Sequence, residues 1–295
     1  MALTFYTPPG IGDFSAIYTK LCSIDREIII RPAQDSPQRI SPYLDILPKI
    51  KNGGYAGHNC NVPLALTLPP GTDITSLEDG DYFLSVNAWL EEGNRIENWI
   101  PGKTDFHYKM EMDLQHISLV YRLLDGLEDR IKIGVYCSAY GNSRHWGFWG
   151  VAQWCEFLGK VAVLFPSKKA TFIFIGAEYD LALAEHIQPW MKEQGFDAKY
   201  TVGQFHIAGT IKLIESLDYL FSFPSGLGFL ADVVRTPNMM WFPPQLKNMM
   251  GTFCDPLQFM SGQSCHSLFT TPDEAVSLFK TFGLHFATGE KSCLK

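Results

Sequence analysis

The sequence predicts an α/β fold made of two doubly wound parallel sheets. Strand-like and helix-like segments alternate along most of its 295 residues, which is the pattern of parallel strands joined by helices. The alternation is regular between residues 131 and 242 and less tidy in the first half of the chain. A chain of this length also suits two domains better than one compact core. We therefore expect two such domains facing a central cleft.

The first half opens with an apolar strand that ends at two prolines. Residues 2–6 are apolar and β-branched, and Pro8 and Pro9 cannot continue a hydrogen-bonded ladder. Residues 53–80 suggest a strand with loops, and residues 94–112 have no clear period. Further strands are expected over residues 27–31 and 82–86, and helices over residues 14–21, 37–51 and 114–127.

The second half repeats a strand-then-helix unit. Strands are expected over residues 131–137, 170–175, 198–202, 219–223 and 239–242, with helices over 149–165, 180–193, 208–217 and 227–234. Thr271, Pro272 and Glu274 form a helix start, and Gly283 supplies its end. We therefore expect one domain over residues 1–129, a second over 130–270, and a C-terminal helix and tail over 271–295 that packs back.

A glycine-rich turn carrying one carboxylate follows the first strand. Gly10 and Gly12 tolerate backbone conformations that other residues resist, and Asp13 stands at the start of the next helix. Because the helix dipole and free amides stabilise an anion there, we expect a low pKa for this carboxylate. The turn alone leaves two interpretations open, since Asp13 is either a functional carboxylate or a simple N-cap.

A second glycine-rich turn follows the strand expected over residues 219–223. It contains Ser225, Gly226, Leu227 and Gly228, and the helix that begins near Leu227 presents free amides. The two glycines would let an anion approach the backbone, so phosphate is the expected ligand. The alternative is a tight strand-to-helix turn with no ligand.

Composition and charge argue against several classes of protein. The net charge of −7 opposes broad attraction to nucleic acid or to an anionic membrane. The 7 cysteines are odd in number and scattered, with no CxxC pair, so we expect reduced thiols in place of disulfides or a zinc site. No basic-then-apolar segment begins the chain, and no run is long enough for membrane insertion, so we expect a cytoplasmic protein.

Three segments in order resemble the heptosyltransferase-like glycosyltransferases of the GT-B fold, which are related to ADP-heptose:lipopolysaccharide heptosyltransferases. Gly12-Asp13 is similar to the family's glycine-aspartate after the first strand. Residues 142–146, followed by Trp154, resemble its basic-residue-then-tryptophan segment. Residues 225–231, leading to Thr236-Pro237, resemble its motif of a small residue and glycine before a histidine. Together these segments span nearly the whole chain, and the resemblance implies two Rossmann-like domains.

The resemblance also implies a mechanism. Asp13 would be the catalytic base of an inverting transfer from a nucleotide diphosphate sugar to an acceptor hydroxyl, with no metal and no further cofactor. Arg144 is suited to neutralise the leaving diphosphate, because a guanidinium grips two oxygens. His145 either binds phosphate or packs under the loop, and Glu178 either contacts a ribose or simply starts a helix. The expected donor-binding residues are Ser138, Arg144, His145, Glu178, Ser225, Gly226, Leu227 and Gly228.

The chain departs from the family pattern at two positions. Pro224 stands where the family commonly has an aspartate, and Phe229 stands where it has a histidine that contacts donor phosphate. Backbone amides can still bind phosphate after both changes, but side-chain recognition of the donor changes. The resemblance therefore leaves the donor sugar open.

Several functions compete with glycan transfer. The acceptor could be a hydroxymethylated base of viral DNA, for which Lys49, Lys51, Lys103, Lys109 and Arg95 would have to form a local groove. The chain could instead be a sugar-nucleotide epimerase, or bind a nucleotide sugar without turning it over. A dinucleotide oxidoreductase is disfavoured, because Ser15 replaces the third glycine of GxGxxG and no acidic residue ends the second strand. The acidic net charge favours a glycan acceptor over DNA.

Overall fold

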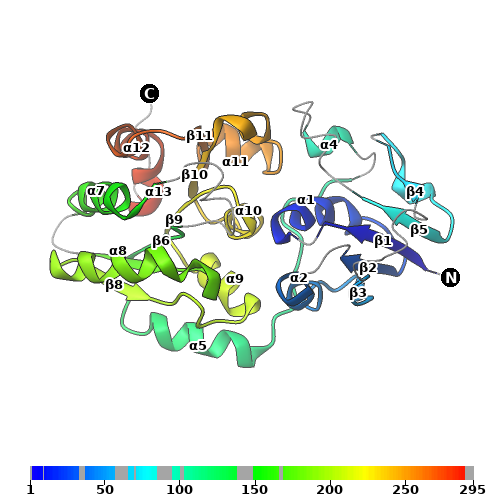
Figure 1. Ribbon diagram of the computed structural model, residues 1–295, viewed down its shortest axis with the longest axis horizontal. Helices are drawn as coiled ribbons and strands as arrows, with labels where there is room; N and C mark the ends of the chain where they lie inside the picture. Colours follow the sequence, from blue (N-terminus) through cyan, green and yellow to red (C-terminus); the bar gives the residue numbers. More distant parts are fainter. Residues whose placement is uncertain are drawn as a thin grey trace.

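The protein has two α/β domains, each built around a parallel sheet, that lie side by side (Figure 1). The computed structural model describes residues 2–8, 10–32, 37–56, 66–69, 71–84, 95–99, 103–137, 149–165 and 169–289. Most of the sequence motifs described above fall inside these ranges, whereas residues 138–148 lie outside them.

The first sheet has five parallel strands in the order β3-β2-β1-β5-β4. The order reverses between β1 and β5, where the amide of Leu84 donates to the carbonyl of Tyr6 over 2.9 Å. Helix α1 follows β1, and helix α2 follows β2. The bounds of these elements are β1 (Leu3–Thr7), α1 (Ile11–Leu21), β2 (Ile28–Pro32), α2 (Pro37–Leu44), β3 (Ile50–Asn52), β4 (Leu66–Thr67), the 3₁₀ turn η2 (Ile74–Ser76) and β5 (Gly80–Phe83).

The second sheet has six parallel strands in the order β11-β10-β9-β6-β7-β8. This is the strand order of a Rossmann fold, and it reverses between β6 and β9. The elements are β6 (Ile131–Val135), α7 (Val151–Ala162), β7 (Ala170–Phe174), the 3₁₀ turn η4 (Glu178–Asp180), α8 (Leu181–Glu193), β8 (Asp197–Tyr200), α9 (Ile207–Glu215), β9 (Tyr219–Ser222), α10 (Gly226–Val233), β10 (Asn238–Phe242) and β11 (Ser264–Leu268).

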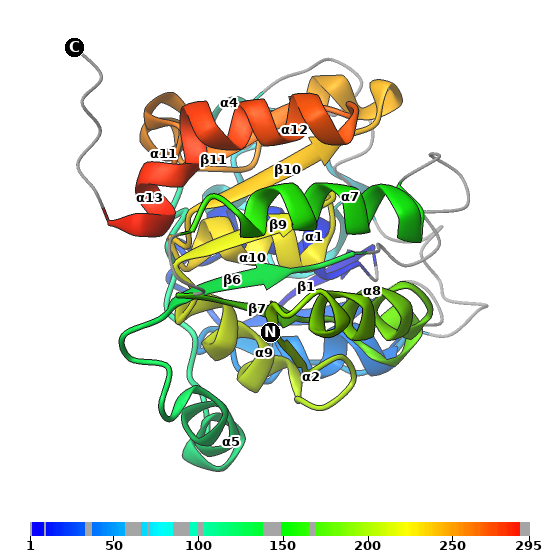
Figure 2. The same ribbon diagram turned by 90° about the vertical axis from the view of Figure 1, so that its left-hand side faces the viewer.

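Two hydrophobic cores cover the two faces of the second sheet. One contains Trp154, Phe221 and Trp241, and joins the sheet to α7 and α8 (Figure 2). The other contains Phe14 of α1, Leu230 of α10 and Met240 of β10, so it runs without interruption from the first domain into the second. The two domains therefore share a core on the side where α1 meets α10.

The remaining helices connect the two domains or pack against the second one. Helix α5 (Leu114–Leu124) packs on α9, where the rings of His116 and His206 stack with centroids 4.2 Å apart. Helix α12 (Pro272–Leu278) packs back on α7 of the second domain, after the capping box that Thr271 and Glu274 form. The remaining elements are α4 (Ile96–Trp99), the 3₁₀ segment η5 (Pro244–Met249), α11 (Pro256–Ser261), the π turn η6 (Phe279–Gly283) and α13 (Leu284–Thr288).

Three expectations about secondary structure are wrong. The helix expected over residues 37–51 ends at Leu44, because Pro48 cannot continue it, and residues 50–52 form β3. Gly283 does not end the C-terminal helix as expected, because α12 continues without a break through the π turn η6 into α13, which ends before Gly289. Strand β11 was not expected, since Ser264–Leu268 has no apolar alternation and is a strand through its pairing with β10.

Two other expectations concern cysteines and membrane helices. The five cysteines among the described residues, Cys22, Cys137, Cys155, Cys254 and Cys265, are free thiols. No described helix has the length and apolar character needed to cross a bilayer.

Candidate functional site

Both glycine-rich turns lie where the strand order of a sheet reverses. The first turn follows β1, which is next to the reversal between β1 and β5, and the second follows β9, next to the reversal between β6 and β9. In open α/β sheets, ligands bind outside the carboxyl ends of the strands at such a point. Helices α1 and α10 therefore begin at the two positions where ligand contacts are expected.

The two turns contact each other directly. A Cβ atom built on Gly12 would lie 2.9 Å from Cδ2 of Phe229 and 3.3 Å from the backbone nitrogen of Gly226. A Cβ atom built on Gly226 would lie 2.9 Å from Cβ of Ile11. Glycine is therefore needed at both positions so that α1 and α10, which are adjacent in Figure 1, can approach this closely.

Asp13 lies in the first turn of α1 and folds back over Gly10, where a Cβ atom would lie 2.7 Å from Asp13 Oδ2. The expectation of a low pKa is wrong. Burial raises the pKa of Asp13 from 3.8 to about 6, so desolvation outweighs the helix dipole. The simple N-cap interpretation also fails, because Gly10 is the N-cap and Asp13 is inside the helix. A carboxylate with this pKa is a better base than the sequence indicated, and it is still ionised at neutral pH.

The N-terminus of α10 presents backbone amides next to Gly12, the residue before Asp13. Ser225 is the N-cap, but its side chain makes no capping hydrogen bond, and its buried Oγ has no partner among the described residues. The first intrahelical bond is from the amide of Phe229 to the carbonyl of Ser225, so the amides of Gly226, Leu227 and Gly228 precede it. Three amides and one hydroxyl are the donors that a phosphate group needs.

The structure changes the role of Gly228. A Cβ atom there would lie 2.7 Å from Sδ of Met240 and 3.0 Å from Oγ of Ser222, so this glycine lets α10 pack closely on the sheet. The expectation that its missing side chain leaves room for an anion is therefore wrong. Phe229 packs edge-on against Phe253, with ring centroids 5.3 Å apart, and covers Gly12. An aromatic ring thus occupies the position of the family's histidine and adds to the apolar surroundings of the Asp13 turn.

The other expected donor residues divide into two groups. Glu178 is exposed in η4, just after β7, and lies against the turn at Gly203, whose Cβ position would be 3.1 Å from Glu178 Cγ. It stands at the carboxyl edge of the second sheet, as expected for a ribose contact. Ser138, Arg144 and His145 lie outside the described residues, so their expected roles stay predictions.

Sequence reasoning missed the contacts that join the two domains beside this site. Arg95 donates to the carbonyl of Gly251 over 2.5 Å and to that of Cys254 over 2.8 Å. The amide of Ile96 donates to the carbonyl of Thr252 over 3.2 Å. These residues are more than 150 positions apart, so no local pattern could have indicated the contacts. Arg95 was expected in a DNA groove but instead binds backbone carbonyls.

One buried cluster has the residue types of a metal site. Asp232, Cys254 and His266 place one possible ligand atom each within 4.8 Å of the others. However, the amide of Gly251 donates to Nδ1 of His266 over 3.0 Å, so the neutral ring carries its proton on Nε2. That nitrogen faces Asp232 Oδ2 at 3.6 Å. To bind a metal through Nε2, this ring would need its proton on Nδ1, which instead accepts the Gly251 amide, so the geometry favours a buried Asp–His pair over a metal centre.

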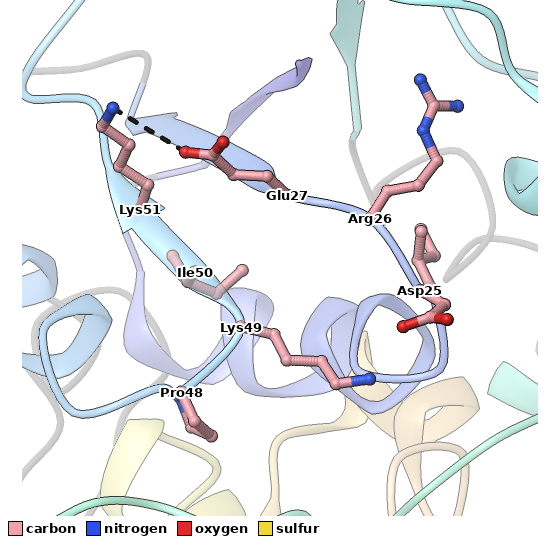
Figure 3. Close-up of a pocket in the computed structure, with 8 residues that line it drawn as sticks. Asp25, Arg26, Glu27, Pro48, Lys49, Ile50 and Lys51 are labelled. Atoms are coloured by element: carbon pink, nitrogen blue, oxygen red, sulfur yellow. Dashed lines mark ion pairs between the residues drawn. The ribbon is translucent and has the colours of Figure 1, made fainter.

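An open pocket of about 680 Å³ lies where β2 and β3 begin, and Figure 3 shows the residues that line it. It is lined by residues that precede β2 and β3, including Lys49, and Lys51 there lies 3.7 Å from Glu27. These are the amino ends of parallel strands, whereas ligands bind at the carboxyl ends. Lys49 and Lys51 are therefore not part of one groove with Asp13.

The raised pKa of Asp13 predicts a pH-dependent stability. The folded state binds the proton more tightly than the unfolded chain, so stability is lost as pH rises from 3.8 through about 6. At pH 8, Asp13→Asn should raise the free energy of unfolding by about 3 kcal/mol, and by almost nothing below about pH 4. Urea unfolding across this range measures the difference, with the exposed Asp81→Asn as control. A difference that does not change with pH would contradict the burial of Asp13.

Comparison with known proteins identifies the fold. No family model and no curated protein matches the sequence. E. coli ADP-heptose LPS heptosyltransferase II matches with a TM-score of 0.65 at 11% identity, covering 99% of this chain and 100% of its own. The family 9 glycosyl transferase of Veillonella parvula matches with a TM-score of 0.61 at 8% identity, covering 95% of this chain and 97% of its own. The chain has the heptosyltransferase fold.

The same GT-B arrangement is found in structures solved with nucleotides. E. coli heptosyltransferase WaaC with ADP matches with a TM-score of 0.54 at 10% identity, covering 96% of this chain and 100% of its own. The expected fold, with two Rossmann-like domains, is therefore confirmed. At these identities the matches establish the architecture, and the chemistry has to be argued from the residues of this chain.

Proposed function

We propose that this protein is an inverting glycosyltransferase that moves a sugar from a nucleotide diphosphate sugar to an acceptor hydroxyl without a metal. The observation that carries the proposal is the contact between the two glycine turns, which puts the turn that carries Asp13 against the N-terminus of α10. One turn offers a base with a pKa of about 6, and the other offers donors for phosphate oxygens.

The reaction follows from these two groups. Asp13 accepts the proton of the acceptor hydroxyl, and the hydroxyl oxygen forms a bond to the anomeric carbon of the donor. The bond between that carbon and the diphosphate oxygen breaks, and its electron pair leaves with the nucleotide diphosphate. Attack from the face opposite the leaving group inverts the anomeric carbon. A base of this pKa is ionised at neutral pH yet basic enough to assist the attack.

The leaving diphosphate needs stabilisation of its negative charge. The amides that precede the first hydrogen bond of α10 and the Ser225 hydroxyl provide neutral donors, and Arg144 would supply the positive charge. Helix amides with a guanidinium can serve in place of a metal ion. The presence of Phe229 supports a donor different from that of family members with histidine there.

A glycan is the better supported acceptor. Two parts of the set considered for a DNA groove lie apart: Lys49 and Lys51 are at the amino edge of the first sheet, and Arg95 binds carbonyls between the domains. A net charge of −7 also opposes association with DNA.

A thermal-shift screen over nucleotide diphosphate sugars tests the proposal. A ligand that binds only the folded state stabilises it by about 2.7 kcal/mol at a hundred times its dissociation constant. We expect one nucleotide class to raise the melting temperature, and the same ligand to give a smaller shift with Arg144→Ala. Lys199→Ala, a substitution on β8, serves as the charge-matched control.

Three outcomes would contradict the proposal. If no nucleotide diphosphate or nucleotide sugar shifts the melting temperature, the donor site does not exist. If a nucleotide sugar binds but is isomerised, with no sugar passed to any acceptor, the protein is an epimerase. Binding without any turnover would identify a non-catalytic nucleotide-sugar-binding protein.

A further inference from the structure

His107 links the two domains, because its backbone is held by the first domain while both nitrogens of its ring contact the second. Nδ1 lies 3.1 Å from the carbonyl oxygen of Val233, the last residue of α10, and Nε2 lies 3.0 Å from Oδ2 of Asp255. The side chain of His107 is 16% exposed, so these contacts take place largely out of solvent. The two partners of the ring lie 126 and 148 positions further along the chain.

The backbone around His107 is held by the first domain. The amide of Asp105 donates to the carbonyl of Thr19, in α1, over 2.8 Å. Tyr108 packs edge-on against Tyr18 of α1, with ring centroids 4.6 Å apart, and its hydroxyl bonds to that of Tyr43. His107 therefore extends from α1 to the C-terminal end of α10.

Both partners of the ring are hydrogen-bond acceptors. A backbone carbonyl cannot donate, and neither can an ionised carboxylate. Burial raises the pKa of Asp255, but the Leu257 amide and His107 outweigh it, so this pKa is lowered and the carboxylate is ionised. Because a neutral imidazole has only one N–H, the full set of contacts needs the doubly protonated ring.

The charges around the ring agree with this protonation state. Asp255 faces Nε2, and Asp105 accepts the backbone amide of His107 with its Oδ1 over 3.0 Å. Arg235, in the turn after α10, is a positive charge that lowers the pKa of Asp255. The same charge disfavours a positive charge on the His107 ring. The carbonyl end of α10 also attracts a cation, since the helix dipole is negative there.

We propose that His107 is a positioning residue, whose doubly protonated ring ties the C-terminal end of α10 to α1 and so fixes Asp13 relative to the α10 amides. The two helices touch at their N-terminal ends through Gly12 and Gly226, and His107 joins them near their C-terminal ends. Held at two places, α10 cannot turn about the glycine contact. This inference rests on the proposed function for its catalytic consequence, but the tie itself is independent of catalysis.

The protonation state is tested first, without any ligand. In ¹⁵N NMR of the full chain, both ring nitrogens of His107 should carry a proton that is protected from exchange with solvent, assigned with His107→Gln. In the same variant, the amides of α10 should exchange with solvent faster, by about tenfold or more, while those of α8 stay unchanged. A ring with a single N–H, or unchanged exchange in α10, would overturn the proposal.

The catalytic consequence is tested with variants. Glutamine keeps the size and polarity but cannot donate at both ends, so His107→Gln should lower turnover by roughly tenfold to a hundredfold with little change in ADP or UDP affinity. His107→Arg, which donates at several nitrogens and stays charged, should restore part of that loss. His186→Gln, at a surface histidine of α8, is the matched control.

The outcomes separate this inference from the proposed function. If the wild-type protein binds no nucleotide, the proposed function fails, while the NMR and exchange results still decide whether His107 ties the helices. If the wild-type protein is active and His107→Gln has normal turnover, the positioning role is wrong and the proposed function stands. An equal loss with glutamine and arginine would likewise contradict a role as a two-ended donor.

Discussion

Replacing Asp13 with asparagine is expected to lower sugar transfer by roughly a thousandfold, because general-base catalysis contributes about 10²–10⁴-fold to rates of this kind. Asparagine keeps the shape of the side chain but cannot accept the proton of the acceptor hydroxyl. Nucleotide affinity should be unchanged or slightly higher, since a negative charge beside the diphosphate is removed. Turnover by the wild-type protein should fall as pH drops through about 6, where Asp13 becomes protonated. Initial rates with the donor found in the thermal screen measure both effects.

The stability effect makes this variant unusually informative. Asp13→Asn should be less active and more stable at once, because the folded protein keeps a desolvated carboxylate ionised at neutral pH. A variant that lost activity through misfolding would be less stable. Normal turnover in Asp13→Asn would show that another group takes the proton and would remove Asp13 from the mechanism.

Enlarging Gly226 is expected to have the second large effect. In Gly226→Val the new side chain would begin 2.9 Å from Cβ of Ile11, so α10 must move away from α1. Overpacking of this kind costs about 1–3 kcal/mol of stability. A displacement of about 1 Å between base and donor site would lower turnover by about a hundredfold. Chemical unfolding and initial rates, measured on the same preparations, give the two numbers.

A control variant and a double variant distinguish loss of the contact between α1 and α10 from a general loss of stability. Gly80→Ala introduces only an ordinary contact, with Tyr82 at 3.4 Å, and should change little. Gly12→Ala should lose less activity when Phe229 is reduced to alanine, because the ring that the new methyl group meets is gone. Strictly additive losses in the double variant would mean that Gly12 and Phe229 act independently.

Much of the fold could be predicted from the sequence, because the strands of the second sheet are continuous apolar runs. Segments such as β7 and β10 are buried on both faces, which is typical of parallel sheets. Strand β11 could not be found in this way. Its serines and histidine have no strand pattern, and the segment becomes a strand by pairing with β10, which the local sequence does not encode.

The positions of the two glycine turns could be predicted, but the electrostatics of Asp13 could not. Each glycine turn has its own local signature, and the location of Asp13 at a helix start follows from that. Its pKa does not, because burial depends on how distant segments pack around the turn, such as α10, which contacts the neighbouring Gly12. His107 was missed for the same reason, since Val233 and Asp255 reach it only in the folded protein.

The core that runs from Phe14 through Leu230 to Met240 has a consequence for how the chain folds. Apolar side chains of α1 and α10 are buried against each other, so separating the domains would expose surface from both. The two sheets should therefore form and melt together, in one cooperative transition. A protein of two parallel sheets would in that case behave thermodynamically as a single folding unit. The proposed site lies at the contact between α1 and α10, which couples the two sheets.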